Sequence, residues 1–150
     1  MSPLRTAIIS WRAKVPFYVL CAFLTQESSG GHNLYGHDAG MPFEGAGPVT
    51  QTNYAQYKTE RDSTDPPRCQ GVGPMQLTWK PYQDRADAAG LRGGCWRAYT
   101  NTLTGARILA EIRADVNSWV EVARNWSGKD SYAEEMRVEL ARWRGVMAAA

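Results

Sequence analysis

Residues 16–31 of the chain read PFYVLCAFLTQESSGG, an unbroken apolar run followed by polar residues and two glycines. Proline is preferred at the start of a helix, and glycine commonly follows its last turn. The pattern therefore predicts a buried helix that begins after Pro16 and ends near Ser28. The run is too short to span a bilayer and lacks the small-residue cleavage site of a signal peptide. We expect neither membrane insertion nor an export signal.

Glu27 lies on the apolar face of this predicted helix. Counted from Leu20, the offsets of Phe23, Leu24 and Glu27 are three, four and seven residues, which places all four on one face. Burial and the negative end of the helix dipole both disfavour a charged carboxylate there, so we expect a raised pKa. Such a carboxyl group can act as a general acid near neutral pH. The alternative is a glutamate that reaches solvent or pairs with an arginine.

The rest of the chain divides into an irregular segment and further helices. Residues 30–75 are rich in Gly, Pro, Asn and Asp, so we expect an irregular lobe with a short hairpin. We also expect a helix over 53–61, on which Tyr54, Tyr57 and Arg61 share a face. An N-terminal helix is predicted to bury an apolar face of Leu4, Ile8, Trp11 and Val15. Other helices are predicted from Thr78 to Gly90, over 101–114 and 117–126, and from a capping box at Ser131 and Glu134. The chain of 150 residues fits a single domain that is mainly helical.

Charge and cysteine content narrow the range of partners and cofactors. The formal net charge is +2, and no dense run of Lys or Arg indicates nucleic-acid binding. Cys21, Cys69 and Cys95 lack the spacing of a zinc site, and we expect no metal and no cofactor. Whether Cys69 and Cys95 pair is left open by the sequence. Six Trp and seven Tyr suit a sugar-binding cleft or, equally, a hydrophobic core.

Four short motifs follow one another along the chain. They are Glu27-Ser28-Ser29-Gly30-Gly31, GVGPMQLT at 71–78, Asn101 with Gly105, and ARNWSG at 123–128 with Tyr132-Ala133. In this order they resemble the lytic transglycosylases and goose-type lysozymes, whose helix ending in Glu-Ser precedes a Gly-x-Met-Gln turn and an Ala-Tyr-Asn segment. A second set is similar, more specifically, to the lysozyme-like catalytic domains of endolysins from phages of actinobacteria. That set comprises Tyr35-Gly36-His37-Asp38, Val49-Thr50, Asn53-Tyr54, Tyr82-Gln83-Asp84 and Gly94-Cys95-Trp96.

The resemblance implies an α+β fold that is mainly α, a lysozyme-like helical domain with a small irregular or β lobe and a substrate cleft between the two. It makes Glu27 the general acid and base, and it places Ser28, Met75, Gln76 and Asn125 against substrate. A glycine-rich turn lets a ligand approach the backbone, and a Gln side chain can both donate to and accept from a sugar amide. The alternative for Met75, Gln76 and Asn125 is a purely structural role in a turn or at a helix end.

One position departs from the family pattern. Arg124 stands where those families have a tyrosine that contacts the catalytic glutamate or the substrate. We expect Tyr132, or another tyrosine, to supply the missing hydroxyl as a substrate-binding group. The alternative is a site in which a nearby arginine lowers the pKa of Glu27.

A second catalytic carboxylate is the open question. Hydrolysis with inversion or retention needs a second Asp or Glu, whereas a lytic transglycosylase uses a hydroxyl of the sugar and needs none. Candidates in the irregular lobe are Asp38, Glu44, Asp62 and Asp65, and Asp38 is the first choice because it follows Glu27 at the start of the lobe. The motifs around Glu27 and Gln76 favour transglycosylation.

The activity implied by the resemblance is cleavage of the β-1,4 bond between N-acetylmuramic acid and N-acetylglucosamine in peptidoglycan, by a lytic transglycosylase or an N-acetylmuramidase. The expected setting is bacteriophage-mediated lysis, by a monomer made in the host cytoplasm that acts on glycan strands of the cell wall. Three alternatives stay open. They are a chitinase-like glycosidase of the same fold, a non-catalytic cell-wall-binding module, and a structural helical bundle in which Glu27 has no catalytic role.

Overall fold

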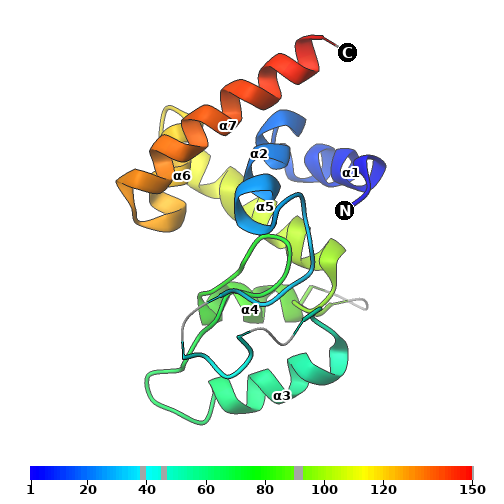
Figure 1. Cartoon of the computed structure of the whole chain (residues 1–150), viewed down its shortest axis with the longest axis vertical. Coiled ribbons are helices and arrows are strands. Elements are labelled where there is room, and N and C mark those ends of the chain that lie inside the picture. Colours follow the sequence, from blue (N-terminus) through cyan, green and yellow to red (C-terminus); the bar gives the residue numbers. More distant parts are fainter. Residues whose placement is uncertain (38–39, 45–46, 90–92, 150) are drawn as a thin grey trace.

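The computed structural model describes residues 1–37, 40–44, 47–89 and 93–149 (Figure 1). These residues form seven helices: α1 (Pro3–Ala13), α2 (Phe17–Ser28), α3 (Gln51–Arg61), α4 (Lys80–Asp87), α5 (Ala98–Asp115), α6 (Trp119–Ser127) and α7 (Asp130–Ala148). The predicted mainly helical fold is confirmed. Within the described part of the chain, β-structure is limited to three isolated bridges, which join Leu34 to Pro48, Tyr35 to Val72, and Val72 to Leu77.

Helix α2 lies in the middle of the larger group of helices. It packs against α1 and α7, while α5 contacts α1, α4 and α6 and so links this group to the α3–α4 part of the molecule (Figure 1). Every residue from Val19 to Leu24 is buried. The helix ends at Ser28 as predicted, with Ser29 in the left-handed region at φ 52° and the Gly30 N–H donating to the Leu24 carbonyl. No single described helix is long and apolar enough to cross a membrane, and α1 and α2 reach that threshold only as a pair bent by 117°.

The predicted buried face of α1 is wrong. Leu4, Ile8 and Trp11 are 72%, 43% and 82% exposed, although Val15, beyond the helix, is buried. The residues that α1 buries are instead Thr6, Ile9, Ser10 and Ala13. Three of these four are small, which allows close approach between α1 and its neighbours α2 and α5 and turns the bulky side chains outward.

Helix α3 follows the predicted pattern, because Tyr54, Tyr57 and Arg61 share its buried face. Arg61 is 1% exposed and, with Asp62, Lys80 and Asp84, forms what we call the Arg61 cluster. Its guanidinium lies 2.8 Å from Asp62 and 3.0 Å from Asp84, and the Lys80 ammonium lies 2.7 Å from Asp84. The hydrogen bond from Arg61 lowers the pKa of the Asp62 carboxyl below its ordinary value.

Several predicted helix starts are wrong, and those of α3 and α6, at Gln51 and Trp119, each differ by two residues. Helix α7 begins at Asp130, one residue before the predicted capping box, and Glu134 pairs with Arg137 instead of reaching back to a cap. Helix α4 begins at Lys80, and the Thr78 hydroxyl donates to the Gln76 carbonyl instead of capping it. The helix ends at Asp87, before Gly90, which lies outside the described residues. Helix α5 begins at Ala98, three residues earlier than predicted.

The three cysteines are free thiols, so Cys69 and Cys95 are not paired in this structure. Burial raises the pKa of the Cys95 thiol to about 12, which keeps it protonated. The Asn101 side-chain amide lies 3.3 Å from the Cys95 sulfur and 3.3 Å from the Cys95 carbonyl oxygen. Cys95 therefore acts as a small packed group beside the turn described below.

Candidate active site

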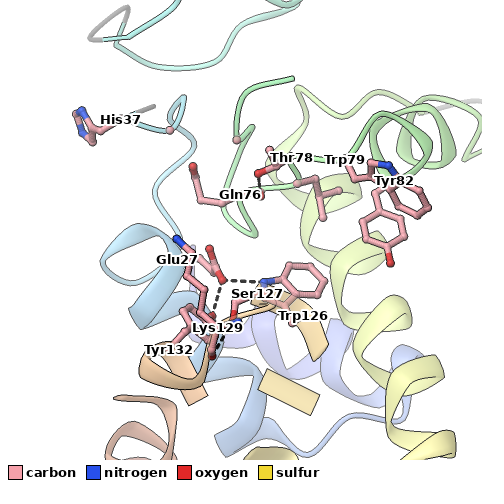
Figure 2. A pocket seen from close by; sticks show the side chains of 13 residues that line it. Glu27, His37, Gln76, Thr78, Trp79, Tyr82, Trp126, Ser127, Lys129 and Tyr132 are labelled. Atoms are coloured by element: carbon pink, nitrogen blue, oxygen red, sulfur yellow. Dashed lines mark hydrogen bonds between the residues drawn. The ribbon is translucent and has the colours of Figure 1, made fainter. Parts of the chain in front are cut away.

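Glu27 lies in the last turn of α2, and its side chain points into a cavity of about 540 Å³ (Figure 2). Leu20, Phe23 and Leu24, on the same face of the helix, are buried and fix the direction of the Glu27 side chain. Besides Glu27, three segments line the cavity: Gly36 and His37; Gly71, Gln76 to Trp79, and Tyr82; and Trp126, Ser127, Lys129 and Tyr132.

Two neutral donors hold one oxygen of the Glu27 carboxyl group. The Trp126 indole N–H donates to Oε1 over 2.8 Å, and the Tyr132 hydroxyl donates to the same oxygen (Figure 2). No described residue hydrogen-bonds Oε2. A proton carried by the Glu27 side chain therefore belongs on Oε2, the oxygen left free by Trp126 and Tyr132.

The pKa of Glu27 is raised above its ordinary value, as the sequence predicted. Burial is the largest cause, and the hydrogen bonds from Tyr132 and Trp126 oppose it, because they stabilise the charged form. Burial also raises the pKa of Tyr132, and the charge of Glu27 adds to that rise. Tyr132 thus stays protonated and remains a hydrogen-bond donor to Glu27.

Arg124 does not contribute to the acidity of Glu27. Its guanidinium is 54% exposed and pairs with Asp130 at 2.6 Å, between the adjoining ends of α6 and α7. Of the two outcomes that the sequence left open, the structure has Tyr132 in contact with Glu27 and no arginine there. The two groups that hydrogen-bond the candidate acid are therefore both neutral.

A tight turn over residues 72–77 forms the floor of the cavity. Val72 and Leu77 exchange backbone hydrogen bonds of 3.0 and 3.3 Å as an isolated bridge, which closes a four-residue loop. The buried side chain of Asn101 holds the loop, accepting from Met75 N–H over 2.9 Å and donating to the Val72 carbonyl over 2.8 Å. A Cβ on Gly73 would lie 2.6 Å from the Asn101 side chain, which explains the glycine.

The side chain of Gln76 lies in the cavity wall, on a backbone with φ of 44°. Its amide nitrogen donates to the carbonyl oxygens of Leu34 and Gly73, over 3.2 and 2.9 Å. A Cβ on Gly71 would lie 2.4 Å from the Gln76 amide oxygen, so the glycine leaves room for this side chain. The two donated bonds fix the Gln76 carboxamide rather than leaving it to swing in solvent.

Ser28 connects the end of α2 to this turn. Its hydroxyl donates to the Pro74 carbonyl over 2.7 Å and accepts from the Gly31 N–H over 3.1 Å. Ser28 does not line the cavity, so its observed contacts are structural. The hydroxyl sets the distance between the candidate acid next to it and the loop that carries Gln76.

Three aromatic side chains line one side of the cavity. The rings of Tyr82 and Trp126 stack with a centroid distance of 6.4 Å and an interplanar angle of 12°. Trp79 meets Tyr82 edge to face at 5.0 Å and is 60% exposed. Trp126 also packs edge to face on Phe23, which links the aromatic wall to the buried face of α2. Flat rings beside polar groups are suited to the faces of sugar rings.

Two other residues predicted to contact substrate lie elsewhere. Met75 is fully buried and packs against Gly105, where an added Cβ would come within 2.7 Å of the Met75 side chain. Asn125 is exposed, outside the cavity lining, and its amide donates to the Glu121 carbonyl within α6. Both observed positions match the structural alternative that the sequence left open.

The predicted second carboxylate, Asp38, lies outside the described residues. Of the carboxylates that the structure does describe, Glu27 alone lines the cavity. Glu44 instead accepts from the Gly40 N–H, and Asp62 belongs to the Arg61 cluster. His37 is exposed and lines the cavity from the segment that precedes Asp38.

Trp126 is the site residue that the sequence reasoning missed. It lies inside the ARNWSG segment that carries the resemblance, but the Glu27 contact joins residues 99 positions apart. Trp79, Tyr82 and Lys129 were likewise given no individual role, although their residue types suit a sugar site. Comparisons of the chain with protein-family models, with curated proteins and with solved structures give no match.

Proposed function

We propose that the chain cleaves the β-1,4 bond between N-acetylmuramic acid and N-acetylglucosamine in bacterial peptidoglycan, with Glu27 as the general acid. One observation carries the proposal: a half-buried carboxyl group with a raised pKa faces an open cavity while only neutral donors hold it. Departure of a sugar from a glycosidic bond requires such a proton donor.

In the first step the Oε2 proton of Glu27 passes to the glycosidic oxygen while the bond from that oxygen to the anomeric carbon breaks. Positive charge develops on the sugar ring, and Glu27 becomes a carboxylate. Trp126 and Tyr132 then stabilise this new negative charge through the hydrogen bonds that they already make to Oε1. The pair of donors thus favours the state of Glu27 that follows proton transfer.

For the second step we favour transglycosylation. The C6 hydroxyl of the muramic acid ring attacks its own anomeric carbon, and Glu27 takes the proton of that hydroxyl, which forms a 1,6-anhydro ring and restores the acid. This route needs one carboxyl group, in keeping with Glu27 as the single described carboxylate in the cavity. Hydrolysis by an N-acetylmuramidase would require a second carboxylate, for which Asp38 remains the candidate.

The substrate would lie in a cleft between the helices and the irregular lobe of residues 30–75. The rings of Trp79, Tyr82 and Trp126 offer apolar faces for sugar rings, and the fixed carboxamide of Gln76 offers its oxygen side to an N-acetyl group. In this proposal the fold is of the lysozyme-like type. By the sequence resemblance, its setting is phage-mediated lysis by a monomer acting on the cell wall.

Product analysis tests the proposal. Purified peptidoglycan treated with the protein should release muropeptides with 1,6-anhydro ends, identified by mass spectrometry, and chitin oligomers should stay intact. Glu27→Gln should lose activity by at least about a hundredfold, the usual contribution of a general acid. Glu60→Gln, an exposed carboxylate on α3, is the matched control and should keep full activity. Cleavage by Glu27→Gln at the rate of the control would contradict the proposal.

A separate variant decides between the two second steps. If transglycosylation is correct, Asp38→Asn should lower activity by roughly tenfold or less, through local charge and hydrogen bonding alone. A severe loss in this variant, together with only reducing ends from the unmodified protein, would instead identify a hydrolase. Reducing ends from an active Asp38→Asn variant would place the base at another residue, and Glu44 would be changed next.

A further inference from the structure

Helix α1 carries an apolar stripe that no described part of the chain covers. Leu4, Ile8 and Trp11 follow one another at helical spacing and are 72%, 43% and 82% exposed. Single exposed apolar residues are common, but a contiguous stripe that includes a tryptophan marks a contact surface. The proposed peptidoglycan site makes no use of it, since no residue of α1 lines the Glu27 cavity.

Positive charge accompanies this stripe. Residues 1–26 contain Arg5, Arg12 and Lys14 and no acidic residue. On the helix, Arg5 and Arg12 lie between the exposed stripe and the buried face, at about 100° and 80° from Leu4 by helical periodicity. Apolar and basic side chains on one exposed surface are the combination by which interfacial helices contact anionic lipids.

A basic cavity of about 900 Å³ adjoins the stripe, between α1 and the beginning of α5. Four arginines line it, Arg5 and Arg12 from α1 and Arg97 and Arg107 from the α5 region. None of the four forms an ion pair with a described carboxylate. Arg107 helps to lower the pKa of Glu111, but the ion pair of Glu111 is with Arg85. The cavity is therefore positively charged and lacks an anion of its own.

The cavity is ordered by specific contacts. The Arg97 guanidinium lies 4.3 Å from the centre of the Trp96 ring, and Arg12 donates to the Tyr99 hydroxyl over 2.9 Å. Helix α5 begins at this point without a side-chain cap, so the positive end of its dipole adds to the field of the arginines. Arginine forks and an uncapped helix start are suited to a phosphate group.

We propose that this face, Leu4, Ile8 and Trp11 together with the four-arginine cavity, docks on the surface of an anionic phospholipid bilayer. The arginines bind lipid phosphates while the stripe enters the interfacial layer, where tryptophan is preferred. A soluble phosphate polymer would account for the arginines but not for the exposed stripe. The docking is peripheral and leaves the Glu27 cavity open, because the two cavities share no lining residue.

Sedimentation of the full chain with lipid vesicles tests this proposal. We expect binding to vesicles of equal parts phosphatidylcholine and phosphatidylglycerol, little binding to phosphatidylcholine alone, and weaker binding as salt rises. Arg97→Gln or Arg107→Gln should weaken binding roughly fivefold each, as expected for one cation near an anionic surface. Trp11→Ser should weaken it roughly tenfold or more through loss of the inserted ring.

Controls come from α7, where Val138→Ser and Arg142→Gln remove an exposed apolar group and one positive charge. These variants should bind the vesicles as the unmodified protein does. No binding to anionic vesicles, equal binding to both kinds of vesicle, or equal losses in the α7 controls would overturn the proposal. Full binding by Trp11→Ser would also overturn it, because it would leave only a site for phosphate. Trp11→Ser should cleave peptidoglycan normally, which separates this test from that of the proposed function.

Discussion

Glu27 and Arg61 are both ionisable groups that the fold buries at least in part, yet their surroundings differ. Around Arg61 the protein provides two carboxylates and a lysine, and these opposite charges keep all four groups ionised. Around Glu27 it provides the hydroxyl of Tyr132 and the indole of Trp126, which are neutral. The pKa of Asp62 falls in the first environment, whereas the pKa of Glu27 rises in the second.

The difference separates a structural use of charge from a chemical one. Ion pairing compensates the burial of Arg61 and joins α3 to α4. At Glu27 the two hydrogen bonds compensate only part of the cost of burying a charge, so ionisation of Glu27 lowers the free energy of unfolding at neutral pH. The result is a carboxyl group that can both give and take a proton. The following changes test this contrast.

Removing the buried cation should have the largest effect. Arg61→Ala opens a space in the core and leaves the buried Gln83 oxygen without its donor, although Lys80 still pairs with Asp62 and Asp84, so unfolding free energy should fall by about 2–5 kcal/mol. Urea denaturation measures it. Arg68→Ala, at an arginine without an ion pair in the described structure, should change stability by no more than about 0.5 kcal/mol. Equal effects of the two variants would refute the assigned role of Arg61.

Removing the charge at Glu27 should raise the free energy of unfolding, whereas the loss of Arg61 lowers it. Because the folded-state pKa is raised, the stability that Glu27 contributes is fully present below its unfolded-state pKa and is lost as pH rises through the folded value. Glu27→Gln cannot ionise, so it should be as stable as the unmodified protein in acid and more stable at neutral pH. Urea denaturation across this pH range measures the gap, and a gap that does not widen with pH would contradict the assignment.

Tyr132→Phe should raise the pKa of Glu27 further. The hydroxyl favours the carboxylate, so its loss leaves burial less opposed. NMR titration of the Glu27 carboxyl carbon measures the shift directly, and the alkaline limb of kcat/KM should move in the same direction. Tyr18→Phe, which removes a hydroxyl contacted by Arg144, is the control. A fall in the pKa of Glu27 in Tyr132→Phe would show that another group governs this carboxyl.

The smallest effect is expected at the rim of the Arg61 cluster. The Asp62 side chain is 42% exposed. When its charge is removed, Arg61 still contacts Asp84 and Gln83. Asp62→Asn should therefore cost no more than about 1 kcal/mol in urea denaturation near neutral pH. A loss as large as that of Arg61→Ala would mean that the cluster depends on the ion pair rather than on the buried guanidinium.

Local spacing was enough to predict where Glu27 and Arg61 lie on their helices, but not which residues contact them. The helical period places Glu27 on the apolar face of α2 and Arg61 beside Tyr54 and Tyr57, and both placements are confirmed. The period does not encode the partners that come from distant segments. Trp126 reaches Glu27 only because α6 and α7 pack together, which no local pattern specifies.

The same limit explains the error at α1. Its apolar stripe was assigned to the core because burial of bulky residues is the common outcome, but the partner surfaces on α2 and α5 accept the small-residue face.

The wrong prediction of a capping box at Ser131 has a similar cause. Asp130, rather than Ser131, starts α7 because the polypeptide enters from the turn at Gly128, and Asp130 pairs with Arg124.

The Ser28 hydroxyl has a consequence for how the cavity can open. Its bond to the Pro74 carbonyl joins the end of α2 and the 72–77 turn into one stiff unit, so the cavity cannot widen along that edge while the bond is kept. A ligand too large for the cavity as it stands would have to displace another edge, such as the one where α6 turns into α7 at Gly128. That edge carries Trp126 and Tyr132, so an outward movement stretches their bonds to Glu27. Opening of the cavity and the proton affinity of Glu27 would thereby be linked in two ways: entry of water would lower the pKa of the carboxyl group, and weaker bonds from Trp126 and Tyr132 would raise it.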